Sequence, residues 1–227
     1  MFDQIHQRLE TPLLPLDDWA ILLENGWDRV GTSFFQRRYD FFERITQDLR
    51  LEQFAAQLMP LRYRLDHTFK FSKSQQAIQR KNADLRKIVR KARLSQEKRN
   101  LFANWYAARF NRSNDIEQWV SGKNSPFPTM EIAFYDKKKL VACSFFDQTI
   151  AGDYSTLAIY DPSEAHRSLG TYTLIAEIEY ALTNNIPYHY PGHAYYEPSK
   201  YDYKKRFHNL EGFDWRSKTW VEVERLC

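Results

Sequence analysis

The sequence predicts an α+β protein with one main core. Of its 227 residues, 43% are apolar and 16% are aromatic, which is enough to form one substantial core. Short helix and strand patterns alternate in the first half, and the second half changes to consecutive strands followed by a helix and one more strand. Seven glycines and no Gly/Ser-rich linker argue against a flexible hinge between independent domains.

The first part of the chain predicts a small mixed region. Residues 17–26 begin with Asp-Asp-Trp and end with Asn-Gly, as a short helix does. Within residues 37–58, apolar side chains recur at helical spacing, at Phe42, Ile45, Leu49 and Phe54. Residues 61–65 alternate Leu, Tyr and Leu with arginine, which indicates a strand.

Three further helices are predicted before the middle of the chain. A polar stretch from Ser72 leads into a helix over about residues 74–85. Ser95, placed before a run of apolar residues, predicts a helix that continues to about residue 110. Residues 115–120 predict a third, short helix.

Three strands in a row are predicted next, at residues 129–134, 139–146 and 151–160, with turns at Asp136-Lys137 and Asp147-Gln148. A loop over residues 162–170 then leads into a helix of about fifteen residues, and a strand follows at residues 186–190. This order resembles the core of a GNAT-like acyltransferase domain. We therefore expect a GNAT-like core over residues 71–227, preceded by the mixed N-terminal region of residues 1–70.

The charge distribution indicates a polyanionic partner. The formal net charge is only +4. Between residues 70 and 112, however, lysine and arginine are frequent and the only acidic residues are Asp84 and Glu97. Such a local excess of positive charge is typical of a nucleic-acid-binding surface.

Cysteine use and hydropathy predict a cytoplasmic protein. Cys143 and Cys227 have neither metal-ligand spacing nor the pattern of a disulfide framework, so no metal site is expected. No apolar run reaches the length of a bilayer span, and the N-terminus lacks the run of a signal peptide. We expect no membrane partner, and the sequence does not indicate an oligomeric state.

Five ordered segments carry a family resemblance. They are Ser72 to Leu85, Asp161-Pro162-Ser163, Arg167-Ser168-Leu169-Gly170-Thr171, Ile186 to Gly192 and Lys200 to Lys204. Their order and spacing resemble the arginyl/leucyl-tRNA–protein transferases, which are aspartate/glutamate N-terminal aminoacyltransferases. The resemblance covers about residues 20–225.

The sequence departs from the family pattern at several positions. Ala55 and Leu58 stand where the family's N-terminal Cys-rich part ends in C-x-x-C, so the chain is a variant without that motif. His193 replaces a family tyrosine, Tyr201 replaces a methionine, and the arginine expected near Gln76 is missing. The resemblance thus leaves the substrate more open than the class of reaction.

The resemblance implies transfer of an amino acid, arginine or leucine, from aminoacyl-tRNA to an amine acceptor, namely a protein N-terminal Asp or Glu. Aminoacyl-tRNA is a co-substrate, and no cofactor is expected. Because the ester is already activated, the enzyme mainly has to position two reactants and stabilise an oxyanion. The absence of a G-x-S-x-G elbow agrees with a reaction that needs no covalent nucleophile.

Three alternatives remain open at this point. The same amide formation can act on a small molecule or peptide in a biosynthetic pathway. An acyl-CoA-dependent GNAT enzyme is the second, although Tyr172 occupies the last position of the R-x-x-G-x-[GA] pattern. The third is a non-catalytic RNA-binding module.

Candidate site residues fall into three groups. Cationic side chains and a loop-to-helix junction suit phosphate binding, and these tRNA-binding candidates are Lys73, Arg80, Lys81, Arg86, Lys87, Arg167, Ser168, Gly170, Thr171, Lys200 and Lys204. The catalytic candidates are His193, as the base for the acceptor amine, with Tyr203 and Asp161. The pocket candidates are Tyr188, Tyr190, Tyr195, Glu197 and Asp202. Each group also has a purely structural interpretation. The cations can form a solvated helix face, the tyrosines can pack in the core, and the acidic residues can pair with nearby lysines.

Overall fold

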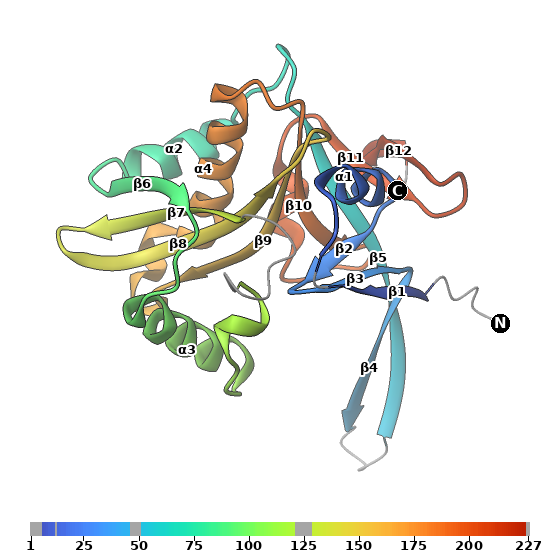
Figure 1. Cartoon of the computed structure of the whole chain (residues 1–227), viewed down its shortest axis with the longest axis horizontal. Coiled ribbons are helices and arrows are strands. Elements are labelled where there is room, and N and C mark those ends of the chain that lie inside the picture. The colour runs from blue at the N-terminus through green and yellow to red at the C-terminus, as the bar shows by residue number, and fades with distance from the viewer. Residues whose placement is uncertain (1–5, 12, 46–50, 121–128, 226–227) are drawn as a thin grey trace.

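The computed structural model describes residues 6–11, 13–45, 51–120 and 129–225. Its main element is a nine-stranded sheet in the order β12-β11-β5-β10-β9-β8-β7-β6, with β4 pairing β5 (Figure 1). Its strands are β4 (Tyr39–Ile45), β5 (Leu51–Arg64), β6 (Arg86–Lys91), β7 (Thr129–Asp136), β8 (Lys139–Gln148), β9 (Asp153–Tyr160), β10 (Tyr188–Tyr195), β11 (Leu210–Asp214) and β12 (Thr219–Glu222).

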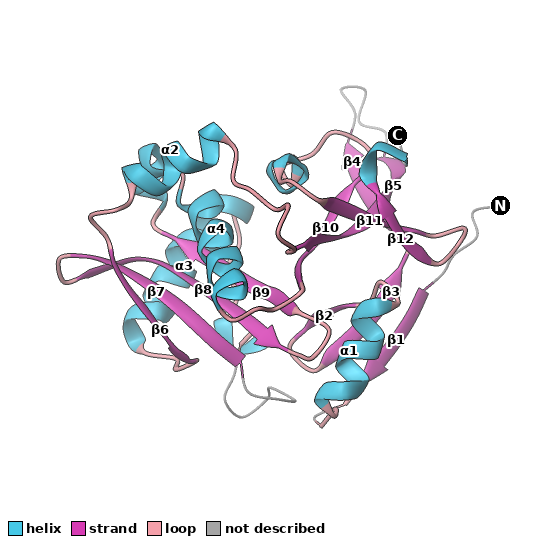
Figure 2. Cartoon of the chain, turned by 90° about the horizontal axis from the view of Figure 1, so that it is seen from above, coloured by secondary structure: helices cyan, strands magenta, loops and turns pink. Residues whose placement is uncertain are grey.

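A small sheet of order β1-β3-β2 lies beside the main sheet near the N-terminus (Figure 2). Its strands are β1 (His6–Glu10), β2 (Asp28–Val30) and β3 (Ser33–Arg37). The α-helices are α1 (Leu16–Glu24), α2 (Lys73–Lys81), α3 (Gln96–Phe110) and α4 (Leu169–Thr183). Short 3-10 helices are η1 (Ile116–Gln118), η2 (Pro162–Arg167), η3 (Asp202–Arg206) and η4 (Val223–Arg225).

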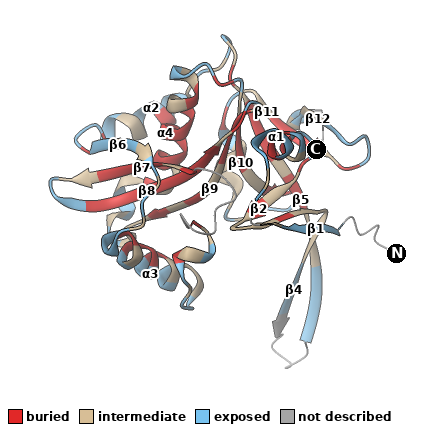
Figure 3. Cartoon of the chain, in the orientation of Figure 1, coloured by how far each residue is buried: buried red, intermediate tan, exposed pale blue. Residues whose placement is uncertain are grey.

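The central strands β7, β8 and β9 are covered by α3 on one face and α4 on the other. Ala133 and Cys143 belong to the cluster that packs against α3, whereas Phe134 and Ala142 belong to the cluster that packs against α4. Successive side chains of a strand point to opposite faces, so a sheet buried on both faces needs nearly continuous apolar strands. These strands and α4 form the most buried part of the molecule (Figure 3).

The predicted meander and the helix after it are confirmed. The predicted turn at Asp147-Gln148 is wrong, because both residues belong to β8 and the chain turns over residues 149–152 instead. β7, β8 and β9 pair antiparallel in chain order, α4 follows, and β10 then pairs parallel to β9. Ser95 caps α3 by accepting a hydrogen bond from the Lys98 N–H, as predicted for that helix start. The α+β class and the predicted order of three strands, a helix and one more strand are therefore confirmed.

The predicted helix within residues 37–58 is wrong. β4 and β5 form an antiparallel hairpin there, in which Phe42 lies directly opposite Phe54 and the two rings stack at 5.3 Å. Cross-strand aromatic pairs of this kind stabilise a hairpin, and the spacing of the same side chains also happens to match a helix. Leu49 lies outside the described residues.

The predicted helix over residues 74–85 is shorter than expected. α2 ends at Lys81 because the buried side chain of Asn82 donates to the carbonyl oxygens of Ile78 and Arg167, each at 2.9 Å. The chain then forms β6, an edge strand that pairs with β7 and that the sequence pattern does not predict. Charged side chains are typical of edge strands, which explains the cationic sequence of β6.

The division of the chain at residue 70 stays a prediction. β5, which precedes residue 70, lies between β10 and β11 in the main sheet.

The strands β9 and β10 separate after a short paired segment. They pair only at His189↔Asp153 and Tyr190↔Tyr154, and the register of β10 against β5 shifts between His189 and Gly192. Gly192 has a φ of +79°, a conformation that strains any residue with a side chain. This bulge opens the space between the two strands in which the candidate site lies.

Candidate active site

Two adjoining pockets lie at the open end of β9 and β10. The inner pocket has a volume of about 310 Å³ and is lined by residues of β9, β10, α4 and the N-terminal region. The outer pocket, of about 330 Å³, lies at the start of α4. Trp105, Arg109, Ala158, Gly170 and Tyr203 line both. A ligand bound across these shared residues can therefore occupy both pockets.

The N-terminus of α4 forms one wall of the outer pocket. Ser168 has a left-handed conformation with a φ of 55°, and no side chain caps the helix. Gly170 is needed for packing, since an added Cβ would lie 3.0 Å from the Tyr160 ring. Uncapped N–H groups and the positive end of the helix dipole make this wall suited to an anion.

Two cations, Arg109 and Lys200, also line the outer pocket. The Arg109 guanidinium lies 5.7 Å from the Trp105 ring centre and 5.8 Å from the Phe110 ring centre, while the Lys200 amine lies 4.5 Å from the latter. Neither cation forms an ion pair with any residue that the structure describes. Burial and the neighbouring Arg109 lower the pKa of Lys200. Two adjacent cations without a protein counter-ion add to the affinity of the outer pocket for an anion.

In the inner pocket, Asp28 orients His193. The Asp28 carboxylate lies 2.7 Å from His193 Nδ1 and also accepts a hydrogen bond from the Tyr154 hydroxyl. Burial alone would raise the pKa of Asp28, but its hydrogen bond with His193 and nearby positive charges lower the pKa overall. An ionised carboxylate on Nδ1 leaves Nε2 as the ring nitrogen able to accept a proton.

Lys204 holds β10 on both sides of Gly192 from inside the inner pocket. Its amine donates to the carbonyl oxygens of Pro191 at 2.7 Å and His193 at 3.2 Å. Burial lowers the pKa of Lys204 to about 8. The structure thus places this predicted tRNA-binding residue in the inner pocket, away from the cationic surface of α2 and β6.

Two predicted tyrosines line the pockets. Tyr203 borders both, and burial raises its pKa. Tyr195 borders the inner pocket and donates to Asp40 at 2.6 Å, and burial together with this hydrogen bond raises its pKa. Both phenols therefore stay protonated at neutral pH and can act as hydrogen-bond donors.

Three predicted acidic residues lie outside both pockets. Asp161 accepts from the Ser163 N–H at the start of η2 and pairs with Lys139 at 2.7 Å. Asp202 accepts from the Ser199 N–H at 2.9 Å. Glu197 is exposed. The contacts of Asp161 and Asp202 are local turn and capping contacts.

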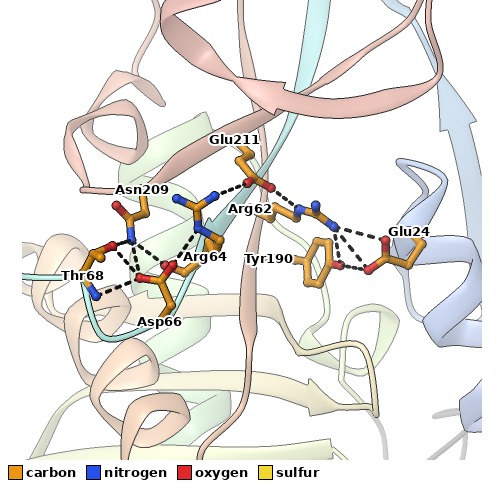
Figure 4. Close-up of polar contacts among 8 residues, drawn as sticks. All are labelled: Glu24, Arg62, Arg64, Asp66, Thr68, Tyr190, Asn209 and Glu211. Atoms are coloured by element: carbon orange, nitrogen blue, oxygen red, sulfur yellow. Dashed lines mark hydrogen bonds and ion pairs between the residues drawn. The ribbon is translucent and has the colours of Figure 1, made fainter.

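Tyr188 and Tyr190 do not line the inner pocket. They contact a polar network next to it instead. Tyr190 donates to Glu24 at 2.7 Å, and Glu24 pairs with Arg62 at 3.2 Å (Figure 4). Arg62 also pairs with Glu211 at 2.6 Å, and its guanidinium lies 4.1 Å from the Tyr188 ring centre. The network connects α1, β5, β10 and β11, which stabilises the strand that carries His193.

A second half of the network continues along β5 to the following turn. Arg64 pairs with Asp66 at 2.9 Å, and Asp66 accepts from Asn209 at 3.1 Å (Figure 4). Hydrogen bonds from Thr68 lower the pKa of Asp66 to about 2. This carboxylate therefore stays ionised and holds the turn after β5 against the residues before β11.

The predicted tRNA-binding cations of the first half divide into two groups. Lys73, Arg80 and Arg86 are exposed and have no ion pair within the described ranges. Lys81 donates to the His166 carbonyl oxygen at 2.9 Å, and Lys87 pairs with Glu179 at 3.3 Å. The first group is therefore free to contact a polyanion, whereas the second also binds neighbouring elements.

Arg167 is held by carboxylates. It donates to both oxygens of Asp84, each at 2.9 Å, and to Glu164 at 3.3 Å. It is not among the residues that line the outer pocket. Its neighbours Ser168, Gly170 and Thr171 do line that pocket, so the predicted motif is at the site although its arginine points to α2.

The sequence patterns do not single out Asp28, Arg109 and Glu177. Asp28 follows a helix end and shows no pattern of its own. Arg109 is one of many cations in its segment. Glu177 has a visible signal, because it is an acidic residue amid the apolar residues of α4.

Within the described ranges, no three His, Cys, Asp or Glu side chains gather in a way that would hold a metal ion. Ala55 and Leu58, at the positions of the family's C-x-x-C, both lie on β5. None of the described helices is long and apolar enough to cross a membrane.

Comparison with known proteins identifies the family. The model of the C terminus of arginine-tRNA-protein transferase matches residues 91–214, which is more than half of the chain. The match includes α3, all the residues that line the outer pocket and the Asp161-to-Lys204 motifs, but not the N-terminal residues that line the inner pocket.

Curated relatives agree with this match. The aspartate/glutamate leucyltransferase of Stenotrophomonas maltophilia (strain K279a) is 32% identical over 107 residues, 45% of this chain and 43% of that protein. The protein of the same name from Hahella chejuensis is 26% identical over 148 residues, 63% of each chain. That from Campylobacter jejuni (strain 81-176) is 28% identical over 191 residues, 81% of this chain and 74% of that protein. The match thus spans 43% and 63% of the length of the first two relatives.

Among solved structures, that of L-PGS from Bacillus licheniformis aligns with a TM-score of 0.49 at 14% identity. The alignment covers 72% of this chain and 48% of that one. The family match and the curated relatives confirm the resemblance carried by the motifs: the chain belongs to the arginine-tRNA-protein transferase family.

Proposed function

We propose that the protein transfers an amino acid from aminoacyl-tRNA to the amine of a protein N-terminal Asp or Glu. The observation that carries this proposal is the junction of two pockets, an outer one suited to an anion and an inner one with the Asp28–His193 pair. The names of the relatives, aspartate/glutamate leucyltransferases, supply the substrate class. Such a reaction takes place in the cytoplasm, where charged tRNA is available.

The outer pocket holds the 3′ end of the tRNA in this proposal. A phosphate accepts hydrogen bonds from the first N–H groups of α4 and is neutralised by Arg109 and Lys200. The terminal base stacks on the aromatic rings around them. Lys73, Arg80 and Arg86 extend the contact to the acceptor stem, where neutralised backbone charge supplies affinity without base readout.

The reaction takes place in the inner pocket. The acceptor amine attacks the ester carbonyl carbon, and His193 Nε2 takes the proton that this nitrogen loses. The tetrahedral intermediate then collapses, the new C–N bond remains, and the bond between the carbonyl carbon and the ribose oxygen breaks. The proton passes from His193 to the leaving ribose oxygen, which becomes a hydroxyl. Asp28 stabilises the transient imidazolium, and the Tyr203 hydroxyl is a candidate donor to the oxyanion.

The test is transfer of radiolabel from charged tRNA to a peptide. A pool of tRNA is charged with one labelled amino acid at a time and mixed with the protein and a peptide that starts with Asp. We expect label on this peptide and little on a matched peptide that starts with Ala. The double variant Arg109→Ala/Lys200→Ala should lose transfer, whereas Arg216→Ala, an exposed arginine in the β11–β12 turn, should retain it.

No transfer from any charged tRNA, together with no detectable tRNA binding, would contradict the proposal. Release of free thiol from an acyl-CoA in the same assay would instead favour the acyl-CoA-dependent alternative. Label that appears in a small product from a cell extract, and not in the peptide, would favour a small-molecule acceptor.

A further inference from the structure

The inner pocket contains a buried carboxylate that the proposed reaction does not use. Glu177 lies on the face of α4 that also presents Gly170, Thr173 and Leu174 to this pocket. The residue is only 1% exposed. Neither oxygen of its carboxylate accepts a hydrogen bond from any residue that the structure describes. A buried carboxylate without such bonds is costly, so its position at the wall of a pocket calls for a ligand.

The neighbours of Glu177 do not satisfy it. His189 Nε2 lies 3.4 Å from Oε2, but the two groups are not aligned as a hydrogen bond. Burial and the neighbouring carboxylates of Glu177 and Asp147 raise the pKa of Asp153 to about 8, so Asp153 holds a proton at neutral pH and supplies no positive charge. The Lys204 amine is close enough for the charge of Glu177 to raise its pKa, but it donates to two backbone carbonyl groups and not to this carboxylate.

The position of Glu177 indicates which part of a substrate it meets. Gly170 lies seven residues before it on the same helical face, which corresponds to about 10 Å of helix rise. If the terminal ribose lies at the start of α4, the ester and the α-amino group of the donor stay near that end. A positive group that reaches Glu177 is then the end of a long side chain.

On this basis we infer that the inner pocket takes a donor amino acid with a long cationic side chain, and that Glu177 is the residue that selects it. The inference rests on the proposed function and deepens it. A guanidinium fits best, because its planar set of N–H donors can bind both free carboxylate oxygens. A leucine side chain in the same place would leave the carboxylate buried and unbonded.

The first test measures binding of small donor analogues without tRNA. L-argininamide, its neutral isostere L-citrullinamide and L-leucinamide are titrated into the full chain by calorimetry. We expect argininamide to bind about 30-fold or more tightly than citrullinamide, because loss of one partner of a buried charge pair has an effect of at least this size. Glu177→Gln should abolish the difference.

The matched control is Glu179→Gln, which removes a carboxylate from the same helix two residues away, where it pairs with Lys87 outside the pocket. This variant should keep the preference for argininamide. Thermal melting checks folding, and Glu177→Gln should melt at or above the temperature of the wild type.

Binding decides the inference, and transfer from tRNA decides the proposed function. Tighter binding of argininamide that is lost in Glu177→Gln supports the inference even if no tRNA serves as donor, in which case only the proposed function fails. Equal binding of argininamide and citrullinamide, an unchanged preference in Glu177→Gln, or no measurable binding of any of the three amides overturns the inference.

Discussion

At the residue scale, the chemistry of the pockets depends on pairs that are far apart in the sequence. Asp28 and His193 are separated by 165 positions, yet their side chains form a hydrogen bond of 2.7 Å. The His193 ring also lies edge-on to Tyr195 and Tyr201, at 5.8 and 5.7 Å between ring centres. Together these contacts define the orientation of the imidazole, which a proton acceptor needs.

The first prediction concerns this pair. His193→Gln should lower the rate of amino-acid transfer by about 10²- to 10⁴-fold, the usual contribution of a positioned general base. Asp28→Asn should act in the same direction, and the double variant should be no slower than His193→Gln because the two residues act as a unit. Single-turnover kinetics with charged tRNA measure the effect, with His208→Gln, an exposed histidine, as the control. A normal rate of transfer in His193→Gln would show that a group other than His193 takes the proton from the acceptor amine.

A second prediction concerns the pH dependence of stability. The pKa of Asp153 is raised to about 8 by burial and by two neighbouring carboxylates. Between about pH 4 and pH 8 the folded protein keeps a proton that the unfolded chain releases, so this group makes the free energy of unfolding fall as pH rises, by at most about 1.4 kcal/mol per pH unit. Below about pH 4 the stabilising contribution is complete.

Asp153→Asn should therefore be more stable than the wild type at pH 8, and its free energy of unfolding should change less between pH 5 and pH 8. Urea unfolding at the two pH values measures both effects. Identical pH dependence in the two proteins would contradict the raised pKa.

At the element scale, buried ion pairs attach helices to the sheet. Lys98 of α3 and Glu131 of β7 are fully buried and form an ion pair, and Lys98 also donates to the Arg93 carbonyl oxygen at 2.5 Å. Glu131 accepts further hydrogen bonds from the Arg90 side chain and the Arg93 N–H. This cluster defines the position of α3, which carries Trp105 and Arg109 to both pockets.

The third prediction follows from that cluster. Lys98→Met should lower the free energy of unfolding by about 3–5 kcal/mol, because it leaves a buried carboxylate with less compensation. The double variant Lys98→Met/Glu131→Met should recover much of this loss, since no unpaired charge then remains buried. Urea unfolding of the two variants and the wild type forms the test, and a double variant less stable than Lys98→Met would contradict the argument.

At the scale of the whole molecule, positive charge is concentrated between residues 70 and 112, although the net charge of the chain is only +4. Exposed cations, among them Lys73, Arg80 and Arg86, come from α2 and from β6, the edge strand of the main sheet. The N-terminal region meanwhile supplies Asp28, Arg37 and other residues to the inner pocket. Segments from both ends of the chain thus contribute to one site.

The fourth prediction concerns the salt dependence of tRNA binding. The logarithm of the binding constant should fall linearly with the logarithm of salt concentration, because binding releases counter-ions. Replacing Lys73, Arg80 and Arg86 with alanine should reduce the slope by about 2 to 3, at about 0.7–0.9 for each phosphate that is no longer neutralised. Filter binding at several salt concentrations measures the slope, and Arg216→Ala should not alter it. An unchanged slope in the triple variant would mean that these three cations do not contact tRNA phosphates and are only solvated surface residues.

Elements that depend only on residues close together in the sequence can be predicted from the sequence of this chain. The three strands of the meander, the cap of α3 at Ser95, the length of α4 and the junction at Ser168 to Thr171 follow from local periodicity and capping. The ordered motifs also indicate the family. These features repeat over a few residues, so a single sequence is enough to see them.

Features that depend on distant contacts are specified by the packing of the folded chain instead. Phe42 and Phe54 have helical spacing, but their pairing across a hairpin makes both segments strands. Arg167, expected at the phosphate site, is bound to Asp84, and Arg109 takes a place beside that site. The reason is physical: burial, charge pairing and pocket geometry depend on which segments pack together, and local sequence does not specify that.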